Sequence, residues 1–166
     1  MLYNSCFRKH FYSNGIRKVE NRKGEFELTV ASIKLLILAA NYLGKVEGRK
    51  RFQKTVFLLQ EQFDIDFGYR FTAYLYGPYS AQLQNDIDIL AQTGYLKASK
   101  IGELFIYEIT PLGREIATQI EKEYGIKSAK ELKEKVENLK GFDTEELVKW
   151  SKQLMGKKIK NNIFAY

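Results

Sequence analysis

The tetrapeptide GPYS at 77–80 constrains the fold of this chain more than any other stretch. Glycine and proline interrupt the aromatic segment before them, because proline has no backbone N–H to donate and its ring fixes φ near the helical value. Ser80 follows as an N-cap residue, whose hydroxyl can accept a hydrogen bond from the first turn of a helix. The pattern predicts a helix over 80–93 that ends before Gly94.

The segments on either side of this tetrapeptide predict further helices and strands. Apolar residues recur at helical spacing in some segments and alternate with period two in others. In chain order, the pattern predicts helices over 30–43 and 49–63, a strand over 69–76, the helix over 80–93, a β-hairpin over 95–109 and a helix over 110–124. Helix, strand, helix and hairpin in this order are typical of a winged helix-turn-helix. We therefore expect a mainly α protein with a small antiparallel sheet (α+β), in which residues 27–125 form a winged-helix domain.

The helix expected over 30–43 is apolar on almost every side. A helix of this kind is buried, because no face of it is suited to water. Thr29 is expected to cap its start and Gly44 to end it. We expect this helix at the centre of the core.

The net charge of +7 is concentrated at the two ends of the chain. Residues 1–24 carry +5 and residues 152–166 carry +4, so the body between them carries −2. Residues 1–26 mix these cations with aromatic side chains and show no clear periodicity. Two interpretations are open: a disordered or loosely docked extension, and a basic arm whose aromatic rings stack on nucleic acid. We expect residues 157–166 to form a second basic tail.

A basic cluster opens the helix expected over 49–63. Cations at a helix N-terminus oppose the helix dipole, and this local cost favours an anionic partner; a solvated basic turn is the other interpretation. Lys50 and Lys54 are four residues apart and are expected to share an exposed face. With two lysines of the hairpin, the candidates for contacts to DNA phosphates are Arg49, Lys50, Arg51, Lys54, Lys97 and Lys100.

The helix expected over 80–93 supplies the candidates for contacts to base edges. Gln82, Gln84 and Asn85 carry amides, which can pair with adenine in the major groove of DNA. This helix has no lysine or arginine, and its carboxylates at Asp86 and Asp88 would repel phosphates. The attraction to DNA must therefore come from the basic cluster, the hairpin or the tails.

The aromatic segment before the tetrapeptide suggests a different partner. In a strand over 69–76, Tyr74 and Tyr76 share one face, and Tyr79 follows shortly after. Aromatic strands more often pack across a sheet than stack on bases. The three tyrosines are also candidates for contact with a partner protein.

Residues 126–156 are expected to form a C-terminal helical hairpin. The sequences SAKE at 128–131 and DTEE at 143–146 predict a capping box at the start of each helix. Two arrangements are open: the pair packs back on the domain, or it makes a homodimer. We favour the dimer, because Trp150 and Leu154 would form a good anchor pair.

Several motifs within residues 30–120 occur in the order of a known family. They are GRKRFQK at 48–54, FLLQ at 57–60, YGPYS at 76–80, GYL at 94–96 and YEITPLG at 107–113. In these motifs the chain resembles the YwgA-like group of prokaryotic winged-helix proteins. It is similar, more distantly, to Panacea-type antitoxin and phage-associated proteins, which share the Gly-Pro helix start after an aromatic segment. The resemblance implies a winged helix, and the connection over 64–79 departs from an ordinary helix-turn-helix, whose turn is far shorter.

The composition argues against several classes of protein. A single cysteine cannot form an intramolecular disulfide, and with the single histidine, His10, it cannot build a structural zinc site. A cytoplasmic setting is expected. The longest apolar run, over 35–40, is far shorter than the roughly 20 residues that cross a bilayer. Without a phosphate-binding glycine loop or a converging acid–base pair in the sequence, we expect no enzyme and no cofactor.

Two functions follow from the sequence. The first is a DNA-binding transcriptional regulator that binds duplex DNA through the basic and amide residues named above, with an affinity that falls steeply with salt. The second is a protein-interaction module, antitoxin-like or an adaptor, that uses the tyrosine surface and is nearly indifferent to salt.

Overall fold

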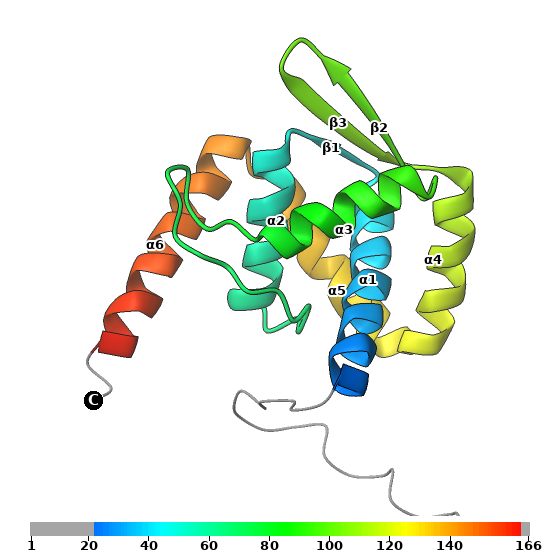
Figure 1. Ribbon diagram of the computed structural model, residues 1–166, viewed down its shortest axis with the longest axis horizontal. Coiled ribbons are helices and arrows are strands. Elements are labelled where there is room, and N and C mark those ends of the chain that lie inside the picture. Colours follow the sequence, from blue (N-terminus) through cyan, green and yellow to red (C-terminus); the bar gives the residue numbers. More distant parts are fainter. Residues whose placement is uncertain (1–21, 164–166) are drawn as a thin grey trace, which may run out of the picture.

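The computed structural model describes the backbone of residues 22–163 and the side chains of residues 30–161. Most of the extension expected at 1–26, and the last three residues, lie outside the described part. Six helices and three strands make up that part (Figure 1): α1 Arg22–Leu43, β1 Lys45–Glu47, α2 Arg49–Glu61, α3 Ala81–Gln92, β2 Leu96–Ile101, β3 Leu104–Ile109, α4 Pro111–Tyr124, α5 Ile126–Lys140 and α6 Thr144–Ile163. The expected class, mainly α with a small antiparallel sheet, is confirmed.

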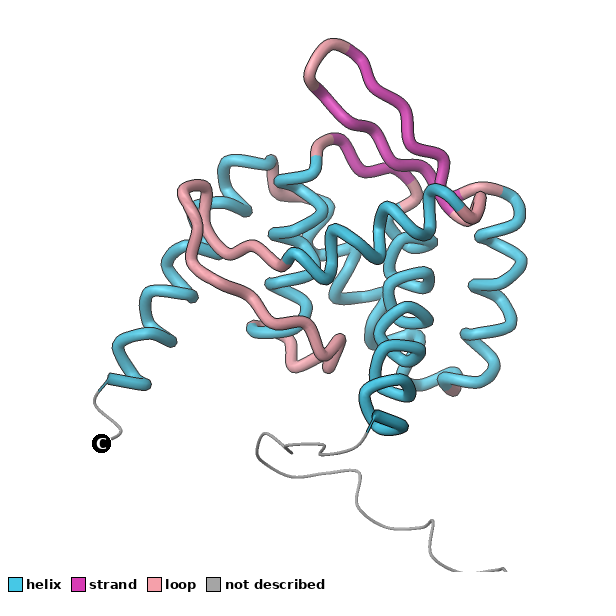
Figure 2. The backbone as a smooth tube through the Cα atoms, viewed as in Figure 1, coloured by secondary structure: helices cyan, strands magenta, loops and turns pink. Residues whose placement is uncertain are grey.

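The sheet has the order β1-β3-β2, and both pairs of strands are antiparallel. Val46 of β1 lies opposite Tyr107, and on the other side of β3 Ser99 lies opposite Ile106. The β2–β3 hairpin extends beyond the helices, as Figure 2 shows. The turn at its tip is shorter than expected, because β2 continues to Ile101.

The strand expected over 69–76 is wrong. This segment contributes one isolated bridge, between Thr72 and Tyr79, and the third strand of the sheet is β1. The chain reverses direction between Tyr74 and Gly77, whose backbone groups bond to each other in both directions. The alternation of buried and exposed side chains in this segment comes from a loop that packs on α2. The alternation fails at Leu75, which is 74% exposed.

α1 lies at the centre of the core, as expected. Leu36, Leu38 and Ala39 are fully buried, and α1 packs against both α4 and α5. It begins at Arg22, so Thr29 lies inside the helix and does not cap it. α2 forms the second part of the core, since every residue from 52 to 59 is buried, and α6 packs against it.

Two of the expected helix starts are confirmed by their hydrogen bonds. The Ser80 hydroxyl accepts from the backbone N–H of Leu83 at 3.2 Å. The Thr110 hydroxyl accepts from the backbone N–H of Gly113 at 3.0 Å, with proline at the first position of α4. Each cap fixes the residue at which its helix begins.

The C-terminal helices differ partly from expectation. The capping box at 143–146 is confirmed: the Asp143 carboxylate accepts from the backbone of Glu146, and the Glu146 carboxylate accepts from the backbone of Asp143, both at 2.8 Å. The box expected at 128–131 is wrong, because α5 already begins at Ile126. α6 continues through Gly156 to Ile163, so most of the expected tail at 157–166 is helical. No helix in the described part is both long and apolar enough to cross a membrane.

Candidate nucleic-acid interface

Arg49 joins the start of α2 to the hairpin. Its guanidinium carbon lies 3.7 Å from the centroid of the Phe105 ring, and its Nε donates to the Tyr107 hydroxyl at 3.3 Å. The backbone N–H of Gly48, just before the helix, donates to the Phe105 carbonyl at 2.7 Å. These contacts hold an exposed cation against the face of a strand, which reduces the freedom that it would lose on binding an anion.

The hairpin lysines lie on β2. The Lys100 ammonium lies 5.6 Å from the centroid of the same Phe105 ring and 3.4 Å from the Glu103 carboxylate. Lys97 is exposed and lies opposite Glu108 in the register of the sheet. Arg49, Phe105 and Lys100 therefore form a basic ridge from the start of α2 to the hairpin, on which Glu103 cancels part of the charge.

Lys50 follows Arg49 on the exposed side of α2. Its ammonium lies 3.9 Å from the centroid of the Tyr76 ring, in the loop before α3. Arg49 and Lys50 line one hollow together with Gln84 of α3. The cations of α2 and the first turns of α3 thus border the same part of the surface.

The other two cations of the expected cluster lie elsewhere. The Arg51 guanidinium donates to the Lys140 carbonyl at 3.4 Å and borders a different hollow, beside Lys45 and Glu47. Lys54 is only 3% exposed, so its expected exposed face with Lys50 is wrong. Its ammonium donates to the Pro78 carbonyl at 2.7 Å. Burial, together with the nearby charges of Lys152 and Lys50, lowers the pKa of Lys54 to about 8.

The exposed face of α3 is uncharged and polar at its start. Gln82 and Asn85 are exposed there, as expected. Gln84 is half-buried; its Nε2 donates to the Asp88 carboxylate at 3.0 Å, and its Oε1 is buried and accepts no hydrogen bond from the described residues. Gln82 and Asn85 are therefore the exposed amides at the start of α3, and the Asn85 side chain also forms a hydrogen bond with Asp86.

Asp86 does not oppose phosphates as expected, because its side chain is turned inward. It is 3% exposed, and its carboxylate accepts a hydrogen bond from the Tyr69 hydroxyl at 2.9 Å. Burial raises the pKa of the Asp86 carboxyl, and the hydrogen bonds from Tyr69 and Asn85 oppose that rise. The exposed surface of α3 is therefore less acidic than its sequence suggests.

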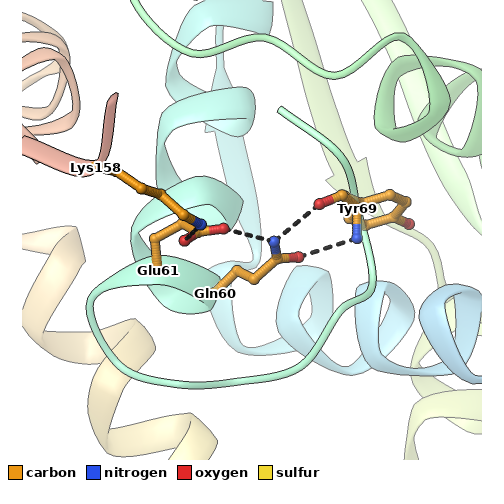
Figure 3. Close-up of polar contacts among 4 residues, drawn as sticks. All are labelled: Gln60, Glu61, Tyr69 and Lys158. Carbon is orange, nitrogen blue, oxygen red and sulfur yellow. Dashed lines mark hydrogen bonds and ion pairs between the residues drawn. The ribbon is translucent and has the colours of Figure 1, made fainter. Parts of the chain in front are cut away.

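Two glutamines of α2 fasten the long connection to α3. The Gln53 amide donates to the Ser80 carbonyl and accepts from the Ser80 N–H, both at 2.9 Å. The Gln60 amide pairs in the same way with Tyr69, at 2.9 Å and 3.0 Å, and next to it Glu61 forms an ion pair with Lys158 of α6 (Figure 3). Both glutamines lie on one face of α2, because seven residues are close to two helical turns. Each amide donates to the carbonyl and accepts from the N–H of one loop residue, as the backbone of a neighbouring strand would.

The tip of this connection carries the expected tyrosine surface. Tyr74 and Tyr76 are 71% and 51% exposed, and Leu75 between them is also exposed. Tyr79 is half-buried, with its ring centroid 5.9 Å from that of Tyr74. The structure brings the three tyrosines together at a turn rather than along one face of a strand.

Trp150 and Leu154 of α6 are half-buried against the core of their own chain. The Trp150 ring contacts Phe63 and Phe142, with centroids 6.1 Å and 5.4 Å away. This is the arrangement in which the helical pair packs back on the domain. A dimer through these two side chains would have to form over a surface that the chain already partly covers.

Comparison with known proteins gives no further assignment: no protein-family model, curated protein or solved structure matches this chain. No group of three or more histidine, cysteine, aspartate or glutamate side chains within the described residues could hold a metal ion. The features that sequence reasoning missed are the burial of Lys54, the inward turn of Asp86 and the two glutamine contacts. The length of the connection over 62–80 was the one signal for these features in the sequence, since a loop of that length has to pack on another part of the protein.

Proposed function

We propose that this chain is a non-enzymatic winged-helix protein that binds duplex DNA in the cytoplasm as a transcriptional regulator. The order α1, β1, α2, α3, β2, β3 and the sheet order β1-β3-β2 support a winged helix, with α3 as the recognition helix and the hairpin as the wing. The resemblance to the YwgA-like group favours the same fold.

The basic ridge of Arg49, Phe105 and Lys100 carries the proposal. It places cations at the start of α2 and on the hairpin. Gln82 and Asn85 are exposed on α3, the helix that follows α2 and precedes the hairpin in the sequence. Cations that hold phosphates and amides that approach base edges are the two kinds of contact that a DNA-binding domain needs. Lys50 extends the ridge, whereas Arg51 and Lys54 take no part in it, and Lys97 lies on the opposite face of the hairpin because it is three residues from Lys100 on β2.

Fluorescence anisotropy with labelled duplex DNA across a salt series tests this proposal. The double variant Arg49→Ala with Lys100→Ala removes two phosphate contacts, so we expect the slope of log K against log salt to become shallower by about 2 and the affinity to fall at least tenfold. Lys122→Ala with Lys130→Ala is the matched control, since it removes the same charge from exposed positions of α4 and α5. Equal losses in the two double variants would contradict the proposal.

A second measurement separates the folded domain from the N-terminal segment. Removal of residues 1–21 leaves every helix and strand of the described part in place. We expect weaker binding, through the loss of sequence-independent attraction, and an unchanged preference among duplexes. Loss of all binding would show that the folded domain does not bind DNA.

The exposed turn at Tyr74, Leu75 and Tyr76 favours a second candidate function, a protein-interaction module. Adjacent exposed aromatic and aliphatic side chains are typical of contact surfaces between proteins. Tyr74→Ala with Tyr76→Ala would then abolish an association that changes little with salt. The same variant leaves DNA binding intact if the first proposal is right.

A further inference from the structure

A hollow lies between α2, the start of α3 and the turn at 74–77. Its volume is about 370 Å³, within the range of small-molecule sites. Its charged lining comes from Arg49, Lys50 and Lys54, and its aromatic lining from Tyr74, Tyr76 and Tyr79. Cations and tyrosines therefore share one concave surface.

Positive charge gathers beside this hollow without a balancing carboxylate. A Cβ on Gly77, which lines it, would lie 3.0 Å from the Lys152 stem and 3.4 Å from the Lys54 stem, so lysines of α6 and α2 flank the same residue. Lys50 approaches from the Tyr76 side. Among the residues that the structure describes, no acidic group forms an ion pair with Lys50, Lys54 or Lys152.

Lys54 is the least expected member of this group. It is buried, yet its ammonium has three N–H donors and the described residues give it one acceptor, the Pro78 carbonyl. A buried ammonium beside two other lysines is costly for the protein unless an anion neutralises it. The lowered pKa of Lys54 has the same cause.

A neutral polar atom points to the rest of the ligand. Gln84 lines the hollow, and its Oε1 is a buried acceptor without a donor among the described residues. Because this oxygen is covered, a ligand N–H or O–H group would reach it by a rotation of the Gln84 side chain. The rings of Tyr74 and Tyr79, 5.9 Å apart, offer aromatic faces on which a planar group can stack.

We propose that this hollow binds a nucleoside phosphate, with the phosphate beside Lys54, Lys50 and Lys152, and the base against Tyr74 and Tyr79. A phosphate monoester carries a charge of about −1.5 to −2 at neutral pH, which matches a group of lysines better than a single carboxylate does. Two sources share this chemistry: a free mononucleotide, and the 5′-phosphorylated end of a nucleic acid strand. Arg49 and Lys50 also belong to the DNA surface proposed above, so a bound nucleotide would compete with duplex DNA.

Isothermal titration of the whole chain with adenosine 5′-monophosphate, in the absence of duplex DNA, tests this site. We expect binding at least tenfold tighter than that of adenosine or inorganic phosphate alone, because only the nucleotide meets both the lysines and the tyrosines. Binding no tighter than that of either half would overturn the proposal. A 5′-phosphorylated single strand that binds at least tenfold tighter than both the mononucleotide and the unphosphorylated strand would support it and identify the strand end as the source.

Variants locate the site. Lys54→Met should weaken nucleotide binding at least tenfold, while Lys97→Met, an exposed lysine of the hairpin, should leave it unchanged. Tyr74→Ala is compatible with folding, because this side chain is mostly exposed. It should lower the affinity for the nucleotide more than the affinity for inorganic phosphate. Equal affinities in the Lys54, Tyr74 and Lys97 variants would overturn the proposal. Because no duplex is present, failure here leaves the DNA proposal standing.

Discussion

The side-chain amide of Gln53 forms two hydrogen bonds with the backbone of Ser80, one in each direction and both 2.9 Å long. Ser80 is also the residue that caps α3. A single glutamine of α2 therefore fixes the position at which the proposed recognition helix begins. All of these groups are buried, so water cannot replace the glutamine.

Substitution of Gln53 should destabilise the fold. Gln53→Met keeps the length of the side chain and leaves the buried Ser80 N–H unpaired, while the Ser80 carbonyl keeps only the Gln84 backbone N–H, so we expect a loss of about 1–3 kcal/mol in the free energy of unfolding. Urea denaturation measures this loss. Gln62→Met, at an exposed position just after α2, is the control and should change stability by less than about 0.5 kcal/mol. Similar losses in both variants would show that the Ser80 contact is not the cause.

Lys54 should give the stability of the protein a distinctive dependence on pH. Its pKa is lowered from 10.5 to about 8 in the folded state. Between these values the unfolded chain keeps a proton that the folded chain has released, so the free energy of unfolding rises with pH. Denaturation midpoints at pH values from 7 to about 9.5 should show this rise in the original chain and in Lys97→Met, but not in Lys54→Met. Above pH 10 the raised pKa values of Tyr42 and Tyr69 make the free energy of unfolding fall with pH, which opposes the effect of Lys54.

The helix starts at Ser80 and Thr110 could be predicted because capping is local. A serine or threonine hydroxyl, a nearby proline and the first turn of the helix lie within a few residues of one another. The central position of α1 could be predicted for a similar reason, since its own apolar residues show that it has no face for water. Most of the helical layout therefore follows from short-range patterns.

Burial of Lys54 could not be predicted, because it depends on a distant segment. The connection over 62–80 folds back over α2, and only then does a lysine on that side become enclosed. The strand β1 was missed for a related reason: a pattern of three residues is too short to distinguish from a linker, and its pairing with β3 joins segments far apart in the chain. The tyrosine segment shows the opposite error, in which alternation caused by loop packing imitates a strand. At the candidate site, the structure differs most from the expectation where two segments distant in the chain meet, as at Lys54.

Gly113, the glycine in the first turn of α4, should not tolerate substitution. A Cβ there would overlap the Tyr95 carbonyl oxygen and lie 2.5 Å from Ile109 Cδ1, so the helix would have to move away from the hairpin. We expect Gly113→Ala to cost about 3 kcal/mol or more. Gly156→Ala in α6 is the control, because its Cβ would meet nothing within 4 Å. Since alanine favours helix, that variant should gain about 0.5–1 kcal/mol, and thermal denaturation of the pair measures both effects. A tolerated alanine at Gly113 would show that α4 and the hairpin pack less closely than described.

Trp150 distinguishes the two roles considered for the C-terminal helices. Its ring is half-buried between Phe63 and Phe142, so Trp150→Ala removes packing within the chain. We expect a loss of about 2–3 kcal/mol in the free energy of unfolding, somewhat below the cost of a fully buried tryptophan. Sedimentation of the variant should show the same association state as the original chain. Ile126→Ala is the control at the most exposed large apolar side chain of the described part, and it should change stability by less than about 0.5 kcal/mol. A Trp150 variant of unchanged stability that dissociates a dimer would instead show that α6 serves as an interface between two copies, with its aromatic contacts inside the chain contributing little.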